Sequence, residues 1–111
     1  MTIRGIGQGP FSPEFHAASE LVGRKWTGAI IYAIFHGRNR FSEIAEAIPG
    51  ISDRLLDERL KELVRHGILE KQDADQGVRG GYQLTEKGLA LRTVLIALYS
   101  WAMKWPAANT A

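Results

Sequence analysis

The chain has 111 residues, of which 45% are hydrophobic and 23% are charged, a composition typical of one compact globular domain and not of a disordered segment. It contains no cysteine, which excludes disulfide scaffolds, thiolate zinc sites, cysteine nucleophiles and thiol redox sensing. The formal net charge of +2 indicates only weak attraction to polyanions.

The first predicted helix follows residues 1–11, which have no hydrophobic periodicity and are expected to form a flexible N-terminal arm. Ser, Pro and Glu at residues 12–14 are typical of a helix start. They supply a capping hydroxyl, a first-turn proline and an acid at the positive end of the helix dipole. We expect this helix to run to Val22 and to end at Gly23.

Three further helices are predicted in the middle of the chain. Residues 25–36 are apolar nearly all round, which indicates the central buried helix. A short third helix is expected to begin with Ser42 as its N-cap and to end at the Pro-Gly pair 49–50. Ser52 caps a fourth helix over residues 52–66. Two capped helices joined by a tight turn are typical of a helix-turn-helix.

After residue 67 the spacing of the hydrophobic residues no longer follows the helical period. Residues 68–73 and 81–84 are predicted to be two short strands joined by a glycine-rich stretch. Thr85 caps a long last helix, residues 86–105, whose apolar stripe advances alternately by four and three residues, the spacing of a coiled-coil seam. Such an apolar helix is expected to need a partner subunit. The stripe consists of Leu91, Leu95, Leu98, Ala102 and Trp105, and Val94 and Trp101 widen it.

This order of elements predicts a mainly α-helical winged helix-turn-helix with a small antiparallel β-hairpin, residues 69–84, as its wing. The domain is expected to span residues 12–106 and to include the first and last helices, with a disordered tail at 107–111. Six segments resemble those of the HxlR-type bacterial regulators, which are relatives of the MarR group. These segments are LVGRKWT at 21–27, RFSEI at 40–44, IPGISDRLL at 48–56, ERLKEL at 58–63, GILE at 67–70 and YQLTEKG at 82–88.

The resemblance covers residues 15–105, most of the chain, and implies a dimeric DNA-binding transcription regulator. Members of that family pair through their first and last helices, which adds Phe15 and Ala18 to the expected contact between two copies. A two-fold homodimer would address successive major grooves roughly 34–36 Å apart, so we expect its operator to be an imperfect palindrome.

The fourth helix has an apolar face and a polar face. At about 100° per residue, Arg54, Asp57, Glu58, Lys61 and Arg65 lie opposite the leucines. Such a face can enter a major groove, where Ser52 can hydrogen-bond to a base or phosphate and Arg54 can donate two hydrogen bonds to guanine. An ordinary solvated face with i,i+4 pairs such as Asp57–Lys61 is the alternative. The predicted DNA-binding residues are Lys25, Arg38, Arg40, Ser42, Ser52, Asp53, Arg54, Asp57, Glu58, Lys61 and Arg79.

Two arginines need separate interpretation. Arg59 points into the apolar arc of the fourth helix, so we interpret it as structural, with a carboxylate or carbonyl partner. Arg79 lies in the hairpin tip, where a wing can insert an arginine into the minor groove. The wing of the family is usually more basic than this one, in which Asp73 and Asp75 lie nearby.

The middle of the chain is acidic, because nine acids outnumber six bases between residues 41 and 80. Asp53, Asp57 and Glu58 lie on or beside the proposed DNA-reading face, where each repels phosphate unless it accepts from a cytosine amino group. We therefore expect fewer than about six neutralised phosphates per dimer. The alternative function is a winged-helix dimer that serves as a protein-interaction module with little DNA binding.

The lack of cysteine also departs from the family, many of whose members carry a cysteine at about the position of Pro13. Any effector must therefore bind non-covalently. Trp26, Tyr32, Tyr99 and Trp101 are candidates to line a pocket for a small aromatic effector between the long helix and the DNA-binding half. The alternative is that these aromatic side chains simply form core or dimer contacts.

No enzyme, cofactor or metal function is predicted. His16, His36 and His66 lie near the ends of different helices, without a second ligand at metal-binding spacing, and no phosphate-binding loop is present. The longest apolar runs, residues 28–35 and 94–99, are shorter than the ~20 residues of a membrane span, and the N-terminus lacks a signal peptide. A cytoplasmic protein with no membrane partner is the expectation.

Overall fold

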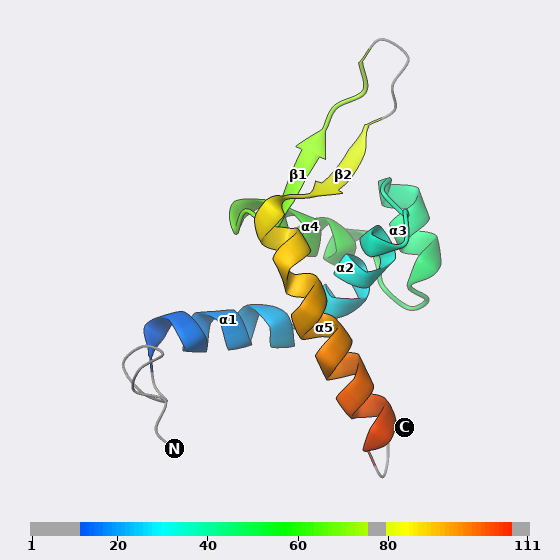
Figure 1. The fold of residues 1–111 in the computed structure, drawn as a ribbon. Coiled ribbons are helices and arrows are strands. Elements are labelled where there is room, and N and C mark those ends of the chain that lie inside the picture. Colours follow the sequence, from blue (N-terminus) through cyan, green and yellow to red (C-terminus); the bar gives the residue numbers. More distant parts are fainter. Residues whose placement is uncertain (1–11, 76–79, 108–111) are drawn as a thin grey trace.

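The computed structural model describes residues 12–75 and 80–107, which form a winged helix-turn-helix (Figure 1). The predictions for residues 1–11, for Arg79 and for residues 108–111 lie outside the described residues. No helix within the described ranges is long and apolar enough to cross a membrane. In chain order the elements are α1 (Pro13–Gly23), α2 (Thr27–Phe35), α3 (Phe41–Ala47), α4 (Asp53–Arg65), β1 (Leu69–Gln72), β2 (Gly81–Leu84) and α5 (Glu86–Lys104).

Three helices begin at the hydroxyl caps that the sequence predicts. Ser12 Oγ accepts a hydrogen bond from the backbone N–H of Phe15 at 3.0 Å, and the Ser52 hydroxyl likewise caps α4. The Thr85 hydroxyl accepts from the N–H of Gly88 at 3.0 Å and starts α5. Because each cap satisfies an otherwise unpaired N–H of the first turn, these residues fix the beginnings of their helices.

The start of α2 differs from the prediction. The helix begins at Thr27 instead of residue 25, because Trp26 adopts a left-handed backbone conformation with φ of 79°, which a right-handed helix cannot include. Lys25 therefore lies in the turn between α1 and α2 and not in the first turn of a helix.

The prediction that Ser42 caps α3 is wrong. The helix begins at Phe41 with Arg40 as its extended N-cap residue, so Ser42 lies inside the first turn. Glu43 supplies the capping group instead, because its Oε1 accepts from the backbone N–H groups of Asn39 at 3.2 Å and Arg40 at 3.1 Å. A carboxylate at this position is also favoured by the positive end of the helix dipole.

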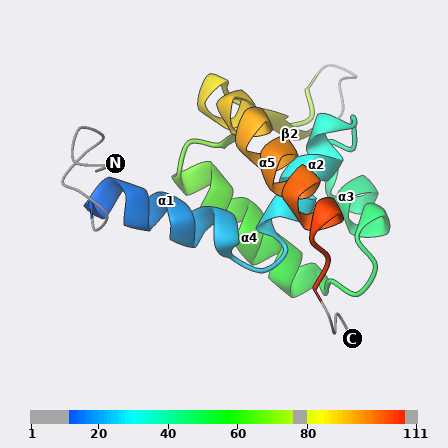
Figure 2. The same ribbon diagram turned by 60° about the horizontal axis from the view of Figure 1, so that its bottom comes forward.

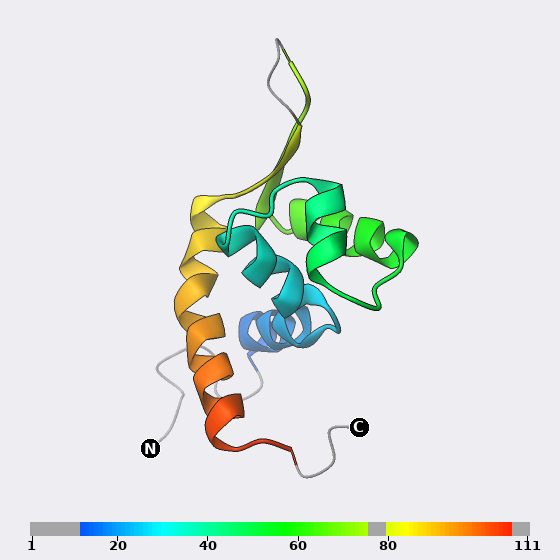
Figure 3. The same cartoon turned by 90° about the vertical axis from the view of Figure 1, so that its right-hand side faces the viewer.

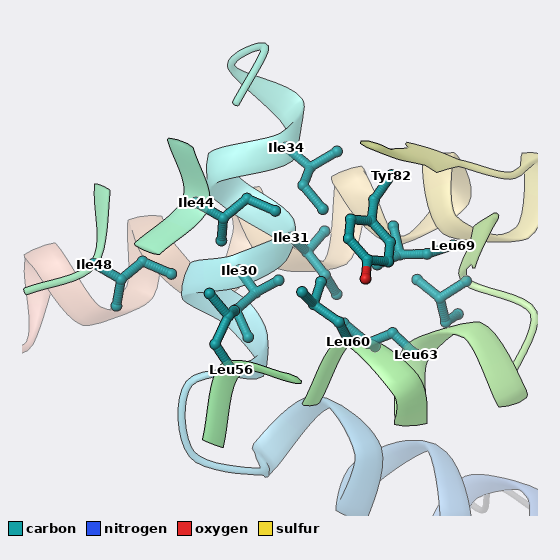
Figure 4. Packing of buried hydrophobic residues seen from close by; sticks show 11 residues of the cluster. Ile30, Ile31, Ile34, Ile44, Ile48, Leu56, Leu60, Leu63, Leu69 and Tyr82 are labelled. Atoms are coloured by element: carbon teal, nitrogen blue, oxygen red, sulfur yellow. The ribbon is translucent and has the colours of Figure 1, made fainter. Parts of the chain in front are cut away.

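The hydrophobic core lies between α2, α3, α4 and the base of the hairpin (Figure 4). As predicted, α2 is central, and its Ile30 and Ile31 are almost completely buried. The apolar face of α4 closes the core from the other side. The cluster consists of Ile30, Ile31, Ile34, Ile44, Ile48, Leu56, Leu60, Leu63, Ile68, Leu69 and Tyr82.

The first and last helices lie outside this core. Helix α1 contains no buried residue and runs out to one side of the body (Figure 2), and Phe15 on it is 62% exposed. Helix α5, the longest, runs past α2 along the body (Figure 3). The described structure is therefore a packed helix-turn-helix flanked by two helices with large exposed apolar surfaces.

The predicted seam of α5 divides into two groups. Leu91 and Leu95 are half-buried and pack against the core of the same chain, and Ala102 is half-buried as well. The exposed members of the predicted seam are Val94, Leu98, Trp101 and Trp105. The stripe is wide enough to serve two contacts, one inside the chain and one available to a partner.

Candidate nucleic-acid interface

Helices α3 and α4 and the turn between them present the polar face of α4 to solvent. Gly50 in this turn has a φ of 95°, a conformation that glycine adopts without the steric cost of a β-carbon. Leu56, Leu60 and Leu63 of α4 point into the core, whereas the Arg54 side chain on the opposite face is 90% exposed. The polar face of α4 is therefore free of the body of its own chain, as DNA binding requires.

Two ion pairs lie on this face, one helical turn apart. Arg54 Nε is 3.3 Å from Glu58 Oε2, and Lys61 Nζ is 2.9 Å from Asp57 Oδ2. The hydrogen bond that the Lys61 ammonium donates to the Asp57 carboxylate raises the pKa of Lys61. The sequence predicts the Asp57–Lys61 pair, but we missed the Arg54–Glu58 pair, although its i,i+4 spacing is the same signal. Both cations thus have acidic partners that compete with DNA for them.

The bases around the start of α3 differ in how they are held. The Arg40 guanidinium bonds Glu43 Oε2 at 2.9 Å. This bond, together with the backbone N–H groups that Glu43 caps, lowers the pKa of Glu43 to about 2. Arg38 is exposed and forms no ion pair within the part of the chain that the structure describes. Of the two, Arg38 is the freer cation.

The turn between α1 and α2 is fastened to α4. Arg59 Nε donates to the backbone carbonyl oxygen of Lys25 at 3.1 Å, which confirms Arg59 as a structural residue with a carbonyl partner. One turn further along α4, Glu62 Oε2 is 3.2 Å from a guanidinium nitrogen of Arg24. The Lys25 ammonium lies 5.2 Å from the centre of the Trp26 ring, within cation–π range.

The wing is an antiparallel hairpin in which Leu69 pairs with Leu84 and Gln72 with Gly81. Asn39, in the loop before α3, joins it: the Tyr82 N–H donates to the Asn39 carbonyl at 2.7 Å, and Asn39 Nδ2 donates to the Tyr82 carbonyl at 3.1 Å. A β-carbon at Gly81 would lie 2.9 Å from this Asn39 oxygen, so the strand approaches closely because it lacks a side chain there. No local sequence pattern marks Asn39 for this role, because its partner Tyr82 lies 43 residues away in the chain.

An apolar groove of about 680 Å³ separates α5 from α2 and α3. Trp26, Tyr32 and Tyr99 are among the residues that line it, and their role in binding an effector stays a prediction. Trp101 does not line it and is 62% exposed, because it lies two residues beyond Tyr99, about 200° around the helix. Within the described residues, no group of three histidine or acidic side chains converges on a point that could hold a metal ion.

Comparison with known proteins identifies the family. The family model described as HxlR-like helix-turn-helix matches residues 21–110. The chain belongs to the HxlR-like helix-turn-helix family. It is 44% identical over 91 residues to the transcriptional regulator YodB of Bacillus subtilis, with 81% of each chain covered. It is 37% identical over 101 residues to YvaP, an HTH-type transcriptional regulator of the same organism, covering 90% of this chain and 94% of that one.

Solved structures agree with this assignment of an HxlR-like fold. The reduced form of YodB from B. subtilis superimposes with a TM-score of 0.78 at 40% identity, covering 89% of this chain and 98% of that one. YodB has also been crystallised in a quinone-bound form, with a TM-score of 0.73 at 42% identity, covering 86% of this chain and all of that one. The chain is therefore a DNA-binding HTH-type regulator, and its family consists of transcriptional regulators.

Proposed function

We propose that this HxlR-like regulator acts in the cytoplasm as a two-fold homodimer on a palindromic operator, with α4 in the major groove and the β1–β2 hairpin as the wing. The observation that carries the proposal is the polar face of α4, which stays exposed while Ser52 caps its N-terminus. In helix-turn-helix proteins the N-terminal residues of this helix contact base edges.

The proposed roles follow from the chemistry of each side chain. Arg54 donates two hydrogen bonds to guanine once it turns from Glu58 to DNA, and Asp57 accepts from a cytosine amino group once Lys61 turns away. Glu58 lies beside these contacts, where its charge lowers the attraction of the face for phosphate. Ser52 is the N-cap residue of α4 and Asp53 lies in its first turn. Their short side chains can approach the DNA bases or the sugar-phosphate backbone. The remaining proposed contacts, to phosphate or the minor groove, come from Lys25, Arg38, Arg40, Ser42, Lys61 and Arg79.

The exposed apolar surfaces of α1 and α5 support dimerisation. Leu98, Trp101 and Trp105 lie along one side of α5 and are 49–62% exposed, and Phe15 of α1 is equally accessible. Contiguous exposed apolar patches of this kind mark protein contacts. The proposed dimer contact comprises Phe15, Ala18, Leu91, Val94, Leu95, Leu98, Trp101, Ala102 and Trp105, with Leu91, Leu95 and Ala102 contributing their solvent-facing edges.

The test is an alanine substitution of Arg54, after the bound sequence has been selected from random DNA fragments. Arg54→Ala should weaken binding by about 1–3 kcal/mol, with the loss concentrated at one base position in each half-site. Arg65→Ala is the matched control, because Arg65 lies on the same polar face but in the last turn of α4. Equal effects of the two substitutions would contradict major-groove entry by the N-terminus of α4.

A protein-interaction module is the second candidate, and the ion pairs of α4 favour it. Arg54 and Lys61 already have carboxylate partners, so this face offers little net positive charge to a phosphate backbone. This alternative predicts that random-fragment selection yields no saturable DNA ligand at all. A selected palindrome would rule it out.

A further inference from the structure

The groove between α2 and α5 has the dimensions and composition of a small-molecule site. Its volume of about 680 Å³ falls inside the range of roughly 300–1,000 Å³ that such sites occupy. Trp26, Tyr32 and Tyr99 form its aromatic walls, and Ala29 and Ala33 leave space along the α2 side. The α5 side is lined by Leu95, Leu98 and Ala102, which also belong to the proposed dimer contact, so the groove borders that contact and the ligand enters beside it. The rings of Tyr32 and Tyr99 stack with 15° between their planes, which gives the site a flat wall.

The polar groups of the groove are basic. Arg38 and His36 line it, and none of the residues that line it is acidic. Arg38 has no ion-pair partner among residues 12–75 and 80–107, so its guanidinium can take an anion without breaking an existing pair. A guanidinium at the edge of an apolar site matches a carboxylate in a bidentate geometry.

From these features we propose that the groove binds a planar aromatic carboxylate, with the ring between Trp26 and the Tyr32–Tyr99 wall and the carboxylate on Arg38. Flat aromatic walls favour an aromatic ring over an aliphatic chain of the same size, because ring faces stack. Charge complementarity with Arg38 favours an anion over a neutral aromatic molecule.

The groove also touches the helix-turn-helix, which gives the ligand a route to DNA affinity. Ile48 and Pro49, at the end of α3, line the groove, and they lead directly into the turn before α4. The Trp26 ring packs against this turn, since a β-carbon at Gly50 would lie 3.7 Å from it. Ligand binding at Trp26 therefore biases the position of the α3–α4 turn. This regulatory step rests on the proposed function.

The first experiment measures binding of 2-naphthoate to the full chain without DNA by isothermal titration calorimetry, with neutral 2-naphthalenemethanol as the comparison probe. We expect saturable binding of 2-naphthoate. Arg38→Gln should weaken it at least tenfold and leave binding of the alcohol unchanged. Arg92→Gln is the matched control, because Arg92 lies in the neighbouring groove on the other side of Tyr32 and Tyr99. Absence of 2-naphthoate binding, or a larger loss with Arg92→Gln, would overturn the site.

A second variant tests whether a protein side chain fills the groove instead. Ala29→Leu adds bulk at an exposed position that lines the groove and should abolish 2-naphthoate binding without changing the oligomeric state measured by sedimentation. If the variant instead becomes monomeric and the original chain binds no 2-naphthoate, a second copy of the chain occupies the groove and the ligand site is overturned.

The regulatory step has its own test. By linkage, DNA must change the affinity for 2-naphthoate by the same factor that 2-naphthoate changes the affinity for DNA. We expect at least a fivefold coupling, and identical 2-naphthoate affinities with and without the selected operator would overturn regulation while leaving the site. If the chain binds 2-naphthoate but selects no DNA, the proposed function is wrong and the ligand site stands. If it binds DNA but not 2-naphthoate, only the ligand site is wrong.

Discussion

Glu43 shows how one side chain defines the entry to the helix-turn-helix. Its carboxylate caps the N-terminus of α3 and holds the Arg40 guanidinium, so it ties together the loop, the helix start and a proposed phosphate contact. These bonds favour the ionised form, which is why the pKa of Glu43 falls to about 2. The phosphate contact proposed for Arg40 is therefore linked to the charge on Glu43.

This linkage predicts a specific pH dependence. Because the folded-state pKa of Glu43 lies below its ordinary value of 4.5, the stabilisation from Glu43 is present above about pH 4.5 and is lost as the pH falls towards 2. NMR titration of the Glu43 carboxyl should show this lowered pKa. The free energy of unfolding of Glu43→Gln should fall below that of the original chain at pH 6 and approach it near pH 2.

Glu46→Gln is the control for this prediction, because Glu46 is exposed on the same helix and makes no ion pair within the described residues. Glu46→Gln removes the same charge without removing a capping contact, so it shows how much of the effect of Glu43→Gln comes from the charge alone. A constant difference for Glu43→Gln between pH 6 and pH 2 would show that the Glu43 contacts do not persist in solution.

Gly88 is a second residue whose identity the packing dictates. A β-carbon there would overlap the backbone carbonyl oxygen of Ile68, which cannot move without shifting the chain before β1. Gly88→Ala should therefore destabilise the protein by about 1–3 kcal/mol, as overpacking generally does. Thermal unfolding measures this loss.

Gly23→Ala is the matched control, since nothing lies within 4 Å of a β-carbon at the end of α1. It should leave stability unchanged or raise it by up to about 1 kcal/mol, because alanine loses less backbone entropy than glycine. Equal destabilisation by the two substitutions would contradict the close approach at Gly88.

On α4, two internal ion pairs neutralise much of the charge of the proposed DNA-reading face. Its two ion pairs lie on exposed side chains, where they contribute little to stability but set the charge that DNA meets. Glu58→Gln should free Arg54 and increase DNA affinity severalfold, with a steeper dependence of log affinity on log salt. Glu46→Gln, which removes the same charge from α3, should have a smaller effect. A weaker affinity for Glu58→Gln would indicate instead that Glu58 accepts from a base.

The DNA affinity of the original chain should depend only weakly on salt concentration, because Arg54 and Lys61 are already paired with acidic side chains. We expect a slope that corresponds to fewer than about six neutralised phosphates per dimer, measured by titrating the selected operator at several salt concentrations. A slope near −10 would contradict the neutralised reading face.

The elements that the sequence predicts well are those fixed by local chemistry. The Ser12, Ser52 and Thr85 caps act within three residues of the chain, so their patterns identify α1, α4 and α5. The start of α3 could not be found this way. Ser42 fits the local pattern of a cap, but the bonds from Asn39 to Tyr82 and from Glu43 to the loop place the helix start two residues earlier.

The candidate site was predictable to a similar degree. Helical periodicity places Arg54 and Lys61 outward and Arg59 inward, and the structure agrees. The left-handed turn at Trp26 and the inward packing of Leu95 depend on tertiary contacts that periodicity does not encode. The position of Trp101, by contrast, follows from periodicity alone, because two residues beyond Tyr99 is about 200° around the helix and outside the groove.

The exposed apolar side chains of α5 predict that the molecule is a dimer. Leu98→Asp places a charge in the proposed contact and should produce a monomer, measured by sedimentation velocity. Thr93→Asp is the control, because Thr93 is exposed on the same helix but outside the proposed contact. A Leu98→Asp chain that remains dimeric would refute the seam, and DNA binding should fall sharply with the monomer because each half-site then binds alone.

The lack of any buried residue in α1 has a consequence for how the chain folds. A helix of eleven residues is shorter than the roughly 12–15 residues that an isolated helix needs in water, so α1 depends on its contacts for stability. Within its own chain, Leu21 near its C-terminal end packs against the core, whereas its N-terminal half is exposed. If a second copy covers α1, the helix content of the protein depends on its concentration. Circular dichroism at nanomolar concentration should then lose the signal of about one short helix. Association of two copies and the ordering of α1 should occur as a single event.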